Sequence, residues 1–225
     1  MPARCSPAVT GTDGPEPNRP AASVRGAEAR AWPFAHWLLD DVLPPAAQAA
    51  LLAWDPGAAS HGGDTGGRRD ARNGRRVFVT PATRREPGLD LLARLFDAAE
   101  TREAIAARCG ARLAGTALRL ELCLDTDGFW LEPHTDIGAK KLTLLVALST
   151  GAGAAEWGTD LMTADGRAVA RASGAFNSGL MFVPGEESWH GFVRRPILGL
   201  RRSLIVNFVS SEWRATGELA FGPPA

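Results

Sequence analysis

The stretch TALRLELCL (residues 116–124) is the first of six short apolar runs that decide the fold class of this chain. The others lie at residues 129–134, 141–149, 179–183, 189–193 and 201–209, with turn-forming residues between them. The segments that join these runs lack the apolar period of a helix, which favours antiparallel strands over alternating strands and helices. We therefore expect a mainly β fold in which two sheets form a jelly roll.

The N-terminal half has a different pattern. An Ala/Leu-rich run up to Trp54 follows the helix-start signal Asp41-Val42-Leu43-Pro44-Pro45, and residues 88–109 are expected to form one or two helices that end at Gly110. Residues 1–30 are rich in Pro, Ala, Gly and Arg and are expected to be a disordered arm. We thus expect a single domain over residues 31–225, with a helical layer at 31–110 and the jelly-roll core at 111–213.

The charge balance restricts the class of partner. The chain has 225 residues, 25 basic and 25 acidic, with no formal net charge, which argues against a dedicated binder of nucleic acid or anionic membranes. The sequence shows neither a signal peptide nor an apolar run of membrane-spanning length, so a cytoplasmic protein is expected. Only Lys140 and Lys141 are lysines, and tyrosine is absent. Nothing in the sequence indicates the oligomeric state.

Two segments carry residues typical of a metal site. In His134-Thr135-Asp136 the imidazole and the carboxylate are two positions apart, so on a strand they share one face. A second imidazole, His190, follows an apolar run and a tight turn. Two His and one carboxylate can bind one face of an octahedral metal ion and leave three positions open. The alternative is a His–Asp pair and a second His with structural roles alone.

A basic residue stands in the last apolar run. Arg201 and Ser203 share a strand face, where a guanidinium and a hydroxyl can bind a carboxylate together. The alternative is a solvated arginine in an arginine-rich chain. Arg202 is expected to point the other way, toward the surface.

These motifs occur in the order found in the Fe(II)/2-oxoglutarate-dependent dioxygenase superfamily, and the sequence most resembles its prolyl 4-hydroxylase-like branch. The family pattern is His-x-Asp, a distal His, and a Gly-x-Arg-x-Ser/Ala-Leu strand. Here the distal His follows Asp136 after 53 intervening residues, and the strand begins GLRRSL at Gly199. The resemblance covers residues 32–213 and implies a double-stranded β-helix (jelly-roll, cupin-like) core with flanking helices.

The resemblance also implies a reaction and a set of roles. The expected enzyme uses Fe(II), 2-oxoglutarate and O₂ to oxidise a C–H bond of a small-molecule substrate, a sugar-containing or specialised metabolite being one option, and releases succinate and CO₂. Hydroxylation is the default outcome. By this resemblance His134, Asp136 and His190 are the catalytic and metal-binding residues. The remaining roles are those of the co-substrate site, which the family pattern assigns to Arg201, Ser203 and Thr143.

One departure from the family concerns the co-substrate site. Relatives often place a tyrosine on the strand after the His-x-Asp motif, where it bonds the distal carboxylate of 2-oxoglutarate. Ala147 stands at that position here, so Thr143 or Ser203 would have to supply the hydroxyl. Two other classes remain open: a cupin-like metalloenzyme that does not use 2-oxoglutarate, and a non-catalytic binding or sensor jelly roll.

Other polar residues have roles that the sequence leaves open. Arg119 and Glu121 alternate with leucines, so they face either solvent or a cavity, and solvent is the expectation. Strand alternation places Lys141 on the face of Thr143, toward the expected site. The loop at residues 56–76 contains five arginines and is either a lid over substrate or a solvated loop.

Overall fold

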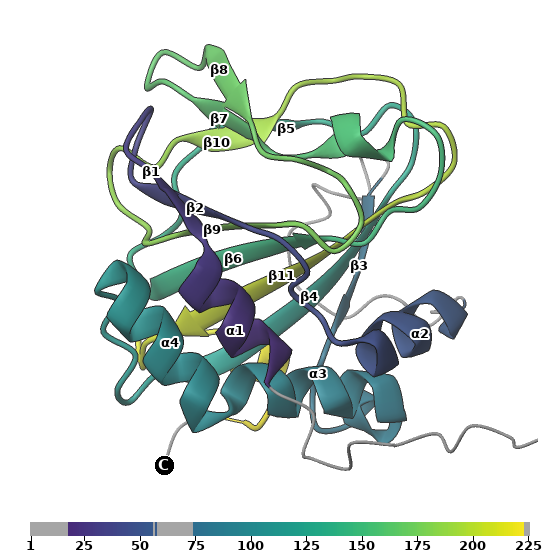
Figure 1. Ribbon diagram of the computed structural model, residues 1–225, viewed down its shortest axis with the longest axis vertical. Helices are drawn as coiled ribbons and strands as arrows, with labels where there is room; N and C mark the ends of the chain where they lie inside the picture. Colours follow the sequence, from purple (N-terminus) through teal and green to yellow (C-terminus); the bar gives the residue numbers. More distant parts are fainter. Residues whose placement is uncertain (1–17, 56, 58–73, 223–225) are drawn as a thin grey trace, which may run out of the picture.

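The computed structural model describes residues 18–55, 57 and 74–222. Two antiparallel sheets lie face to face, and helices cover the far side of the larger one (Figure 1). The larger sheet has the order β1-β2-β9-β6-β11-β4-β3, with β1 (Glu28–Arg30), β2 (His36–Leu39), β3 (Gly74–Phe78), β4 (Ala117–Asp125), β6 (Lys140–Ala147), β9 (Gly179–Phe182) and β11 (Arg201–Val209). The smaller sheet has the order β5-β10-β7-β8, with β5 (Leu131–His134), β7 (Asp160–Met162), β8 (Ala168–Arg171) and β10 (His190–Phe192).

The helical layer packs on the outer face of the larger sheet (Figure 1). It consists of α1 (Arg19–Gly26), α2 (Pro45–Ala53), α3 (Pro87–Asp97) and α4 (Ala99–Cys109), and short 3₁₀ turns lie at η3 (Thr83–Arg85), η4 (Ala154–Trp157) and η5 (Thr216–Glu218). Gly110 ends α4 in the left-handed conformation, as the sequence predicts. The main hydrophobic core therefore lies between helices and sheet, outside the space enclosed by the two sheets.

Alternation along β4 explains why the larger sheet has two different faces. Leu118, Leu120 and Leu122 are buried in the core beneath the helices. Their neighbours Arg119 and Glu121 point to the opposite face, toward the smaller sheet, because successive residues of a strand alternate. The inner face of this strand is thus polar although it is buried.

All six predicted strand segments are strands in the structure. They correspond to β4, β5, β6, β9, β10 and β11. The β4–β11 and β6–β11 pairings are the longest in the sheet and run nearly the full length of these strands. The expected fold class, mainly β with flanking helices, is confirmed.

The predicted disordered arm is wrong from residue 18 onward, because Arg19–Gly26 forms α1. Asn18 caps this helix by accepting a hydrogen bond from the backbone N–H of Ala21 at 3.1 Å. The buried residues Ala21 and Val24 are small, so α1 packs on α4 without the large apolar side chains whose absence suggested disorder. Residues 1–17 lie outside the described part of the chain.

The predicted loop at 56–76 also ends earlier than expected. Gly74–Phe78 forms β3 and pairs with β4, so the loop prediction is wrong for residues 74–76. The arginines at 68, 69 and 72 lie outside the described residues. Of the helices in the described part of the chain, none has the length and apolar character needed to cross a membrane.

The segment at Gly158 has no room for a side chain. A Cβ added there would lie 1.7 Å from the carbonyl oxygen of Ala172. We expect Gly158→Ala to lower the free energy of unfolding by about 1–3 kcal/mol or more, because the backbone must move to relieve the clash. Thermal or urea unfolding followed by circular dichroism measures this loss. Gly217→Ala, which meets nothing within 4 Å, is the control, and equal stability of the two variants would contradict the packing.

Candidate metal centre and its cavity

The pairing of β5 with β10 builds the centre of the site. His134 at the end of β5 and His190 at the start of β10 are direct cross-strand partners, and their ring centroids are 4.3 Å apart. Asp136 follows His134 by two positions. One possible ligand atom of each of the three residues lies within 4.8 Å of the other two. Among the described residues, these three form the cluster that could hold a metal ion. The structure therefore brings together the three residues that the sequence predicted.

Backbone carbonyls fix which nitrogen each imidazole presents. The Nδ1 atom of His134 lies 2.9 Å from the carbonyl oxygen of Glu132, and that of His190 lies 2.9 Å from the carbonyl oxygen of Ser188. Because a carbonyl oxygen only accepts, both Nδ1 atoms carry the proton. Each Nε2 atom then has its lone pair available to bind a metal ion.

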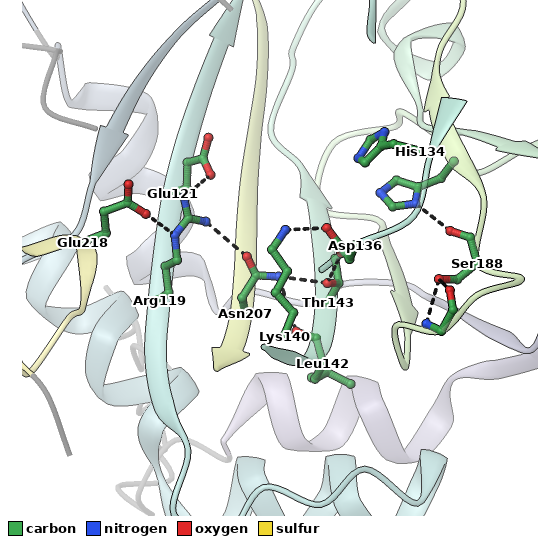
Figure 2. Close-up of polar contacts among 12 residues, drawn as sticks. Arg119, Glu121, His134, Asp136, Lys140, Leu142, Thr143, Ser188, Asn207 and Glu218 are labelled. Atoms are coloured by element: carbon green, nitrogen blue, oxygen red, sulfur yellow. Dashed lines mark hydrogen bonds and ion pairs between the residues drawn. The ribbon is translucent and has the colours of Figure 1, made fainter. Parts of the chain in front are cut away.

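Two donors hold the carboxylate of Asp136. Lys140 Nζ donates to Oδ1 at 2.5 Å, and Thr143 Oγ1 donates to Oδ2 at 2.6 Å (Figure 2). Burial by itself raises the pKa of Asp136, but the charge of Lys140, the imidazole of His190 and the hydrogen bonds outweigh it and lower this pKa to about 2. The carboxylate is thus ionised at neutral pH.

Burial acts in the opposite direction on His190. It disfavours the charged imidazolium, and with the neighbouring His134 it lowers the pKa of His190 to about 4. At neutral pH this imidazole is uncharged, which is the form that binds a metal ion.

The lysine that reaches the site is Lys140, so the expectation for Lys141 is wrong. Lys141 is half-buried, and its Nζ donates to the carbonyl oxygen of Gly138 at 2.7 Å, outside the cavity wall. The reason is a register shift at the start of β6: Leu142 pairs with Phe208 and Lys140 pairs with Val209, so Lys141 is skipped. Such a bulge reverses the alternation of faces, and this explains why Lys140 joins the face of Thr143.

A cavity that is open to solvent, with about 510 Å³ of empty space including the solvent at its mouth, adjoins the three ligands. Its wall also contains Lys140, Thr143, Leu145, Thr159, Arg201, Ser203 and Ile205. The guanidinium of Arg201 is held at its edge: Nε donates to the carbonyl oxygen of Trp157 at 2.7 Å, and Nη1 forms an ion pair with the fully buried Asp125. Arg202 points away toward α2, where Nη1 donates to the carbonyl oxygen of Leu51 at 3.5 Å.

The hydroxyl groups near Arg201 come from two segments. Ser203 lies on the same strand face as Arg201 and opposite Ala147 of β6. Thr159 lies on the other side and lines both this cavity and a second one of about 370 Å³ that also borders Arg201 and Ser203. The side chains of Ser203 and Thr159 therefore both border the cavities that Arg201 lines.

Thr143 lines the cavity, but its hydroxyl group is engaged with Asp136 and with Asn207. The expectation that Arg119 and Glu121 face solvent is wrong: both are buried, and their side chains form an ion pair at 2.8 Å. The sequence motifs did not point to Asn207. The only signal for Asn207 is an amide in the otherwise apolar second half of β11.

Comparison with solved structures identifies the fold. The chain is similar to a Pseudomonas putida prolyl-4-hydroxylase, with 19% identity, 77% of this chain and 92% of that chain covered, and a TM-score of 0.57. It is similar to a Trichoplax adhaerens prolyl hydroxylase in complex with a hypoxia inducible factor peptide, with 14% identity, 86% and 90% covered, and a TM-score of 0.57. HygX from Streptomyces hygroscopicus, with nickel, 2-oxoglutarate and hygromycin B bound, matches with 15% identity, 84% and 92% covered, and a TM-score of 0.50.

No protein-family model and no curated protein matches the chain. The structural matches show that the chain has the double-stranded β-helix fold of these oxygenase structures. The predicted resemblance to the prolyl 4-hydroxylase-like branch is confirmed at the level of the fold.

The donor set fits a divalent iron ion. Two imidazoles and one ionised carboxylate are the ligand set typical of non-haem Fe(II) sites, and the adjoining cavity gives space for further ligands. The arrangement differs from a closed structural site, which would fill every position with protein ligands.

We expect the protein to bind one Co(II) ion, used as a spectroscopic substitute for Fe(II), per chain. His134→Ala and His190→Ala should each weaken this binding by at least about 100-fold, since each removes a ligand outright. Visible absorption titration measures the affinity. His36→Gln is the control, because His36 is buried against the carbonyl oxygen of Phe34 and is no part of the cluster. Undiminished Co(II) binding in both alanine variants would show that His134 and His190 are not the metal ligands.

Proposed function

We propose that this protein is an Fe(II)- and 2-oxoglutarate-dependent oxygenase that hydroxylates a C–H bond of a small-molecule substrate, with release of succinate and CO₂. One observation carries the proposal. The ligand triad His134, Asp136 and His190 opens onto a cavity that Arg201 also lines. A metal ion and a guanidinium in the wall of one cavity match the two ends of a dicarboxylic 2-oxo acid.

Bound Fe(II) would activate O₂, which is the oxidant, and 2-oxoglutarate would supply two of the four electrons for its reduction on conversion to succinate and CO₂, the substrate C–H bond supplying the other two. The residues of the chain do the rest: the two Nε2 atoms and the carboxylate of Asp136 would hold the metal. Arg201 attracts the distal carboxylate of the co-substrate, because a guanidinium has five N–H donors and its two described contacts leave donors for a ligand. Phe129 and Phe192, which lie next to this guanidinium, exclude water from the pair.

The second donor to the distal carboxylate is Ser203 or Thr159 in this proposal. Ser203 shares the strand face of Arg201, and Thr159 adjoins both cavities. Ala147, which stands where relatives place a tyrosine, lines the second cavity together with Ser203, Thr159 and Arg201, so either hydroxyl is a candidate donor to a ligand at Arg201.

The proposed substrate is a small molecule. HygX, whose structure contains hygromycin B, supports this class, whereas the Trichoplax structure contains a peptide. A test of both classes compares the rate of succinate formation with a panel of glycosylated metabolites and with proline-containing peptides. Stimulation by peptides alone would contradict the proposed substrate class but not the oxygenase itself.

A metalloenzyme that does not use 2-oxoglutarate is the second candidate. The observation that favours it is the ion pair between Arg201 and Asp125, which neutralises the charge expected to attract the co-substrate. Anaerobic titration with Fe(II) and then 2-oxoglutarate separates the two. A visible charge-transfer band of the chelate supports the oxygenase, and its absence despite metal binding favours the second candidate.

We expect Arg201→Lys to weaken 2-oxoglutarate binding by roughly 10- to 100-fold, because a lysine keeps the charge opposite Asp125 but loses the planar pair of donors. The anaerobic titration gives the dissociation constant, and Co(II) binding confirms that the metal site is intact. Arg202→Lys is the matched control on the adjacent, outward-facing position. Equal 2-oxoglutarate affinity in both variants would remove Arg201 from the co-substrate site.

A further inference from the structure

A row of polar side chains crosses the inner face of the larger sheet and ends at the proposed metal site (Figure 2). Arg119 on β4, Asn207 on β11 and Thr143 on β6 are register partners, so they lie side by side on one face. Nη1 of Arg119 lies 3.2 Å from Oδ1 of Asn207, and Nδ2 of Asn207 lies 2.9 Å from Oγ1 of Thr143. Thr143 is in turn 2.6 Å from Oδ2 of Asp136.

The chemistry of the first member sets the direction of every bond in this row. An arginine only donates, so the atom of Asn207 that faces Arg119 must be its oxygen. The amide nitrogen then faces Thr143 and donates to the threonine oxygen. Because that oxygen already accepts a hydrogen bond from Asn207, the hydroxyl proton of Thr143 is directed to the carboxylate of Asp136.

Arg119 is anchored at the far end of the row. Its Nε donates to Glu218 at 2.6 Å and its Nη2 lies 2.8 Å from Glu121, while its guanidinium lies against the rings of Phe78 and Trp213. Arg119 is 4% exposed, Glu121 3% and Glu218 6%. Burial acts to lower the pKa of Arg119, but the two glutamates outweigh it and raise the pKa, so this group remains a donor.

We propose that Arg119 and Asn207 are positioning residues that act through Thr143 to fix the carboxylate of Asp136 for metal binding. The proposal deepens the proposed function, since it concerns how the same site holds its metal. Lys140 contacts the other oxygen, Oδ1, so both oxygens have a defined donor. A carboxylate fixed in this way loses little rotational freedom when the metal binds, and groups that orient metal ligands typically contribute 10- to 100-fold to metal affinity.

The decisive variant is Asn207→Asp, which has nearly the same shape. The new carboxylate still accepts from Arg119 but cannot donate to Thr143, so the threonine hydroxyl turns toward it and leaves Asp136. We expect Co(II) affinity to fall by roughly 10- to 100-fold and the visible Co(II) spectrum to change. If residue 207 acted through charge alone, Asn207→Asp would instead raise the Co(II) affinity, because an added negative charge near the site strengthens cation binding.

A double-mutant cycle tests whether Asn207 acts through the hydroxyl group. Thr143→Val removes the donor and should weaken Co(II) binding to a similar degree, and Thr143→Ser, which keeps the hydroxyl, should restore most of it. On the Thr143→Val background, Asn207→Asp should cause no further loss of Co(II) affinity, since the hydrogen bond from residue 143 to Asp136 is already absent. Thr101→Val is the matched control: Thr101 is fully buried, donates to the carbonyl oxygen of Leu95 at 2.6 Å and lies outside the row.

Three outcomes overturn the proposal: tighter Co(II) binding in Asn207→Asp, independent and additive losses in the cycle, or an equal loss of Co(II) affinity in Thr101→Val. The measurement does not use 2-oxoglutarate. If the wild-type protein binds Co(II) but never turns over 2-oxoglutarate, the proposed function is contradicted. The Co(II) affinities of the variants still test the positioning role of Arg119 and Asn207 in that case. A wild-type protein that binds no metal contradicts both.

Discussion

The antiparallel pairing of β5 with β10 is the contact on which the site depends. It places His134 directly opposite His190, although more than fifty residues separate them along the chain. The turn before β10 is held by Ser188, whose hydroxyl accepts from the backbone N–H of Gly185 and donates to its carbonyl oxygen, so the second imidazole enters the pair in a defined position. Gly191, the next residue of β10, lies so close to β5 that a Cβ would be 2.7 Å from the carbonyl oxygen of Leu131. The two strands can approach in this way only with glycine at that position.

The larger sheet separates two tasks by alternation of its residues. Its outer face is apolar and packs on the helices, where burial of leucine, valine and phenylalanine side chains stabilises the fold. Its inner face carries Arg119, Asn207 and Thr143, which are buried polar groups. Such groups are costly unless every donor and acceptor is satisfied, so they restrict one another to a single arrangement. A rigid polar face next to a metal site can fix the orientation of a metal ligand. This is the physical basis for the proposal that Arg119 and Asn207 position Asp136 through Thr143.

The chemistry of the site could be predicted from sequence because it depends on residue types at short spacings. His-x-Asp specifies two ligands on one strand face, and Gly-x-Arg-x-Ser specifies a guanidinium and a hydroxyl on another. The partners of these residues could not be predicted in the same way. Asp125 and Trp157, which hold Arg201, come from distant segments, and the bulge that brings Lys140 into the cavity depends on pairing with β11. The short strands β1, β2, β7 and β8 were not predicted either. They are as short as β5, β9 and β10, but those three lie within longer apolar runs bounded by turn-forming residues, and that context is what predicts a strand.

The sequence by itself determined that the chain has a C-terminal half of antiparallel strands, helices before it, and a set of two histidines and one aspartate. These properties follow from local periodicity and from the identity of the side chains. Only the tertiary structure decided which polar residues face the interior. Arg119 and Glu121 have the alternation of a strand with one solvated face, yet side chains of β3 and of the segment from Trp213 to Glu218 cover them. Alternation gives the two faces of a strand, but what lies against each face is decided by contacts between residues far apart in the chain.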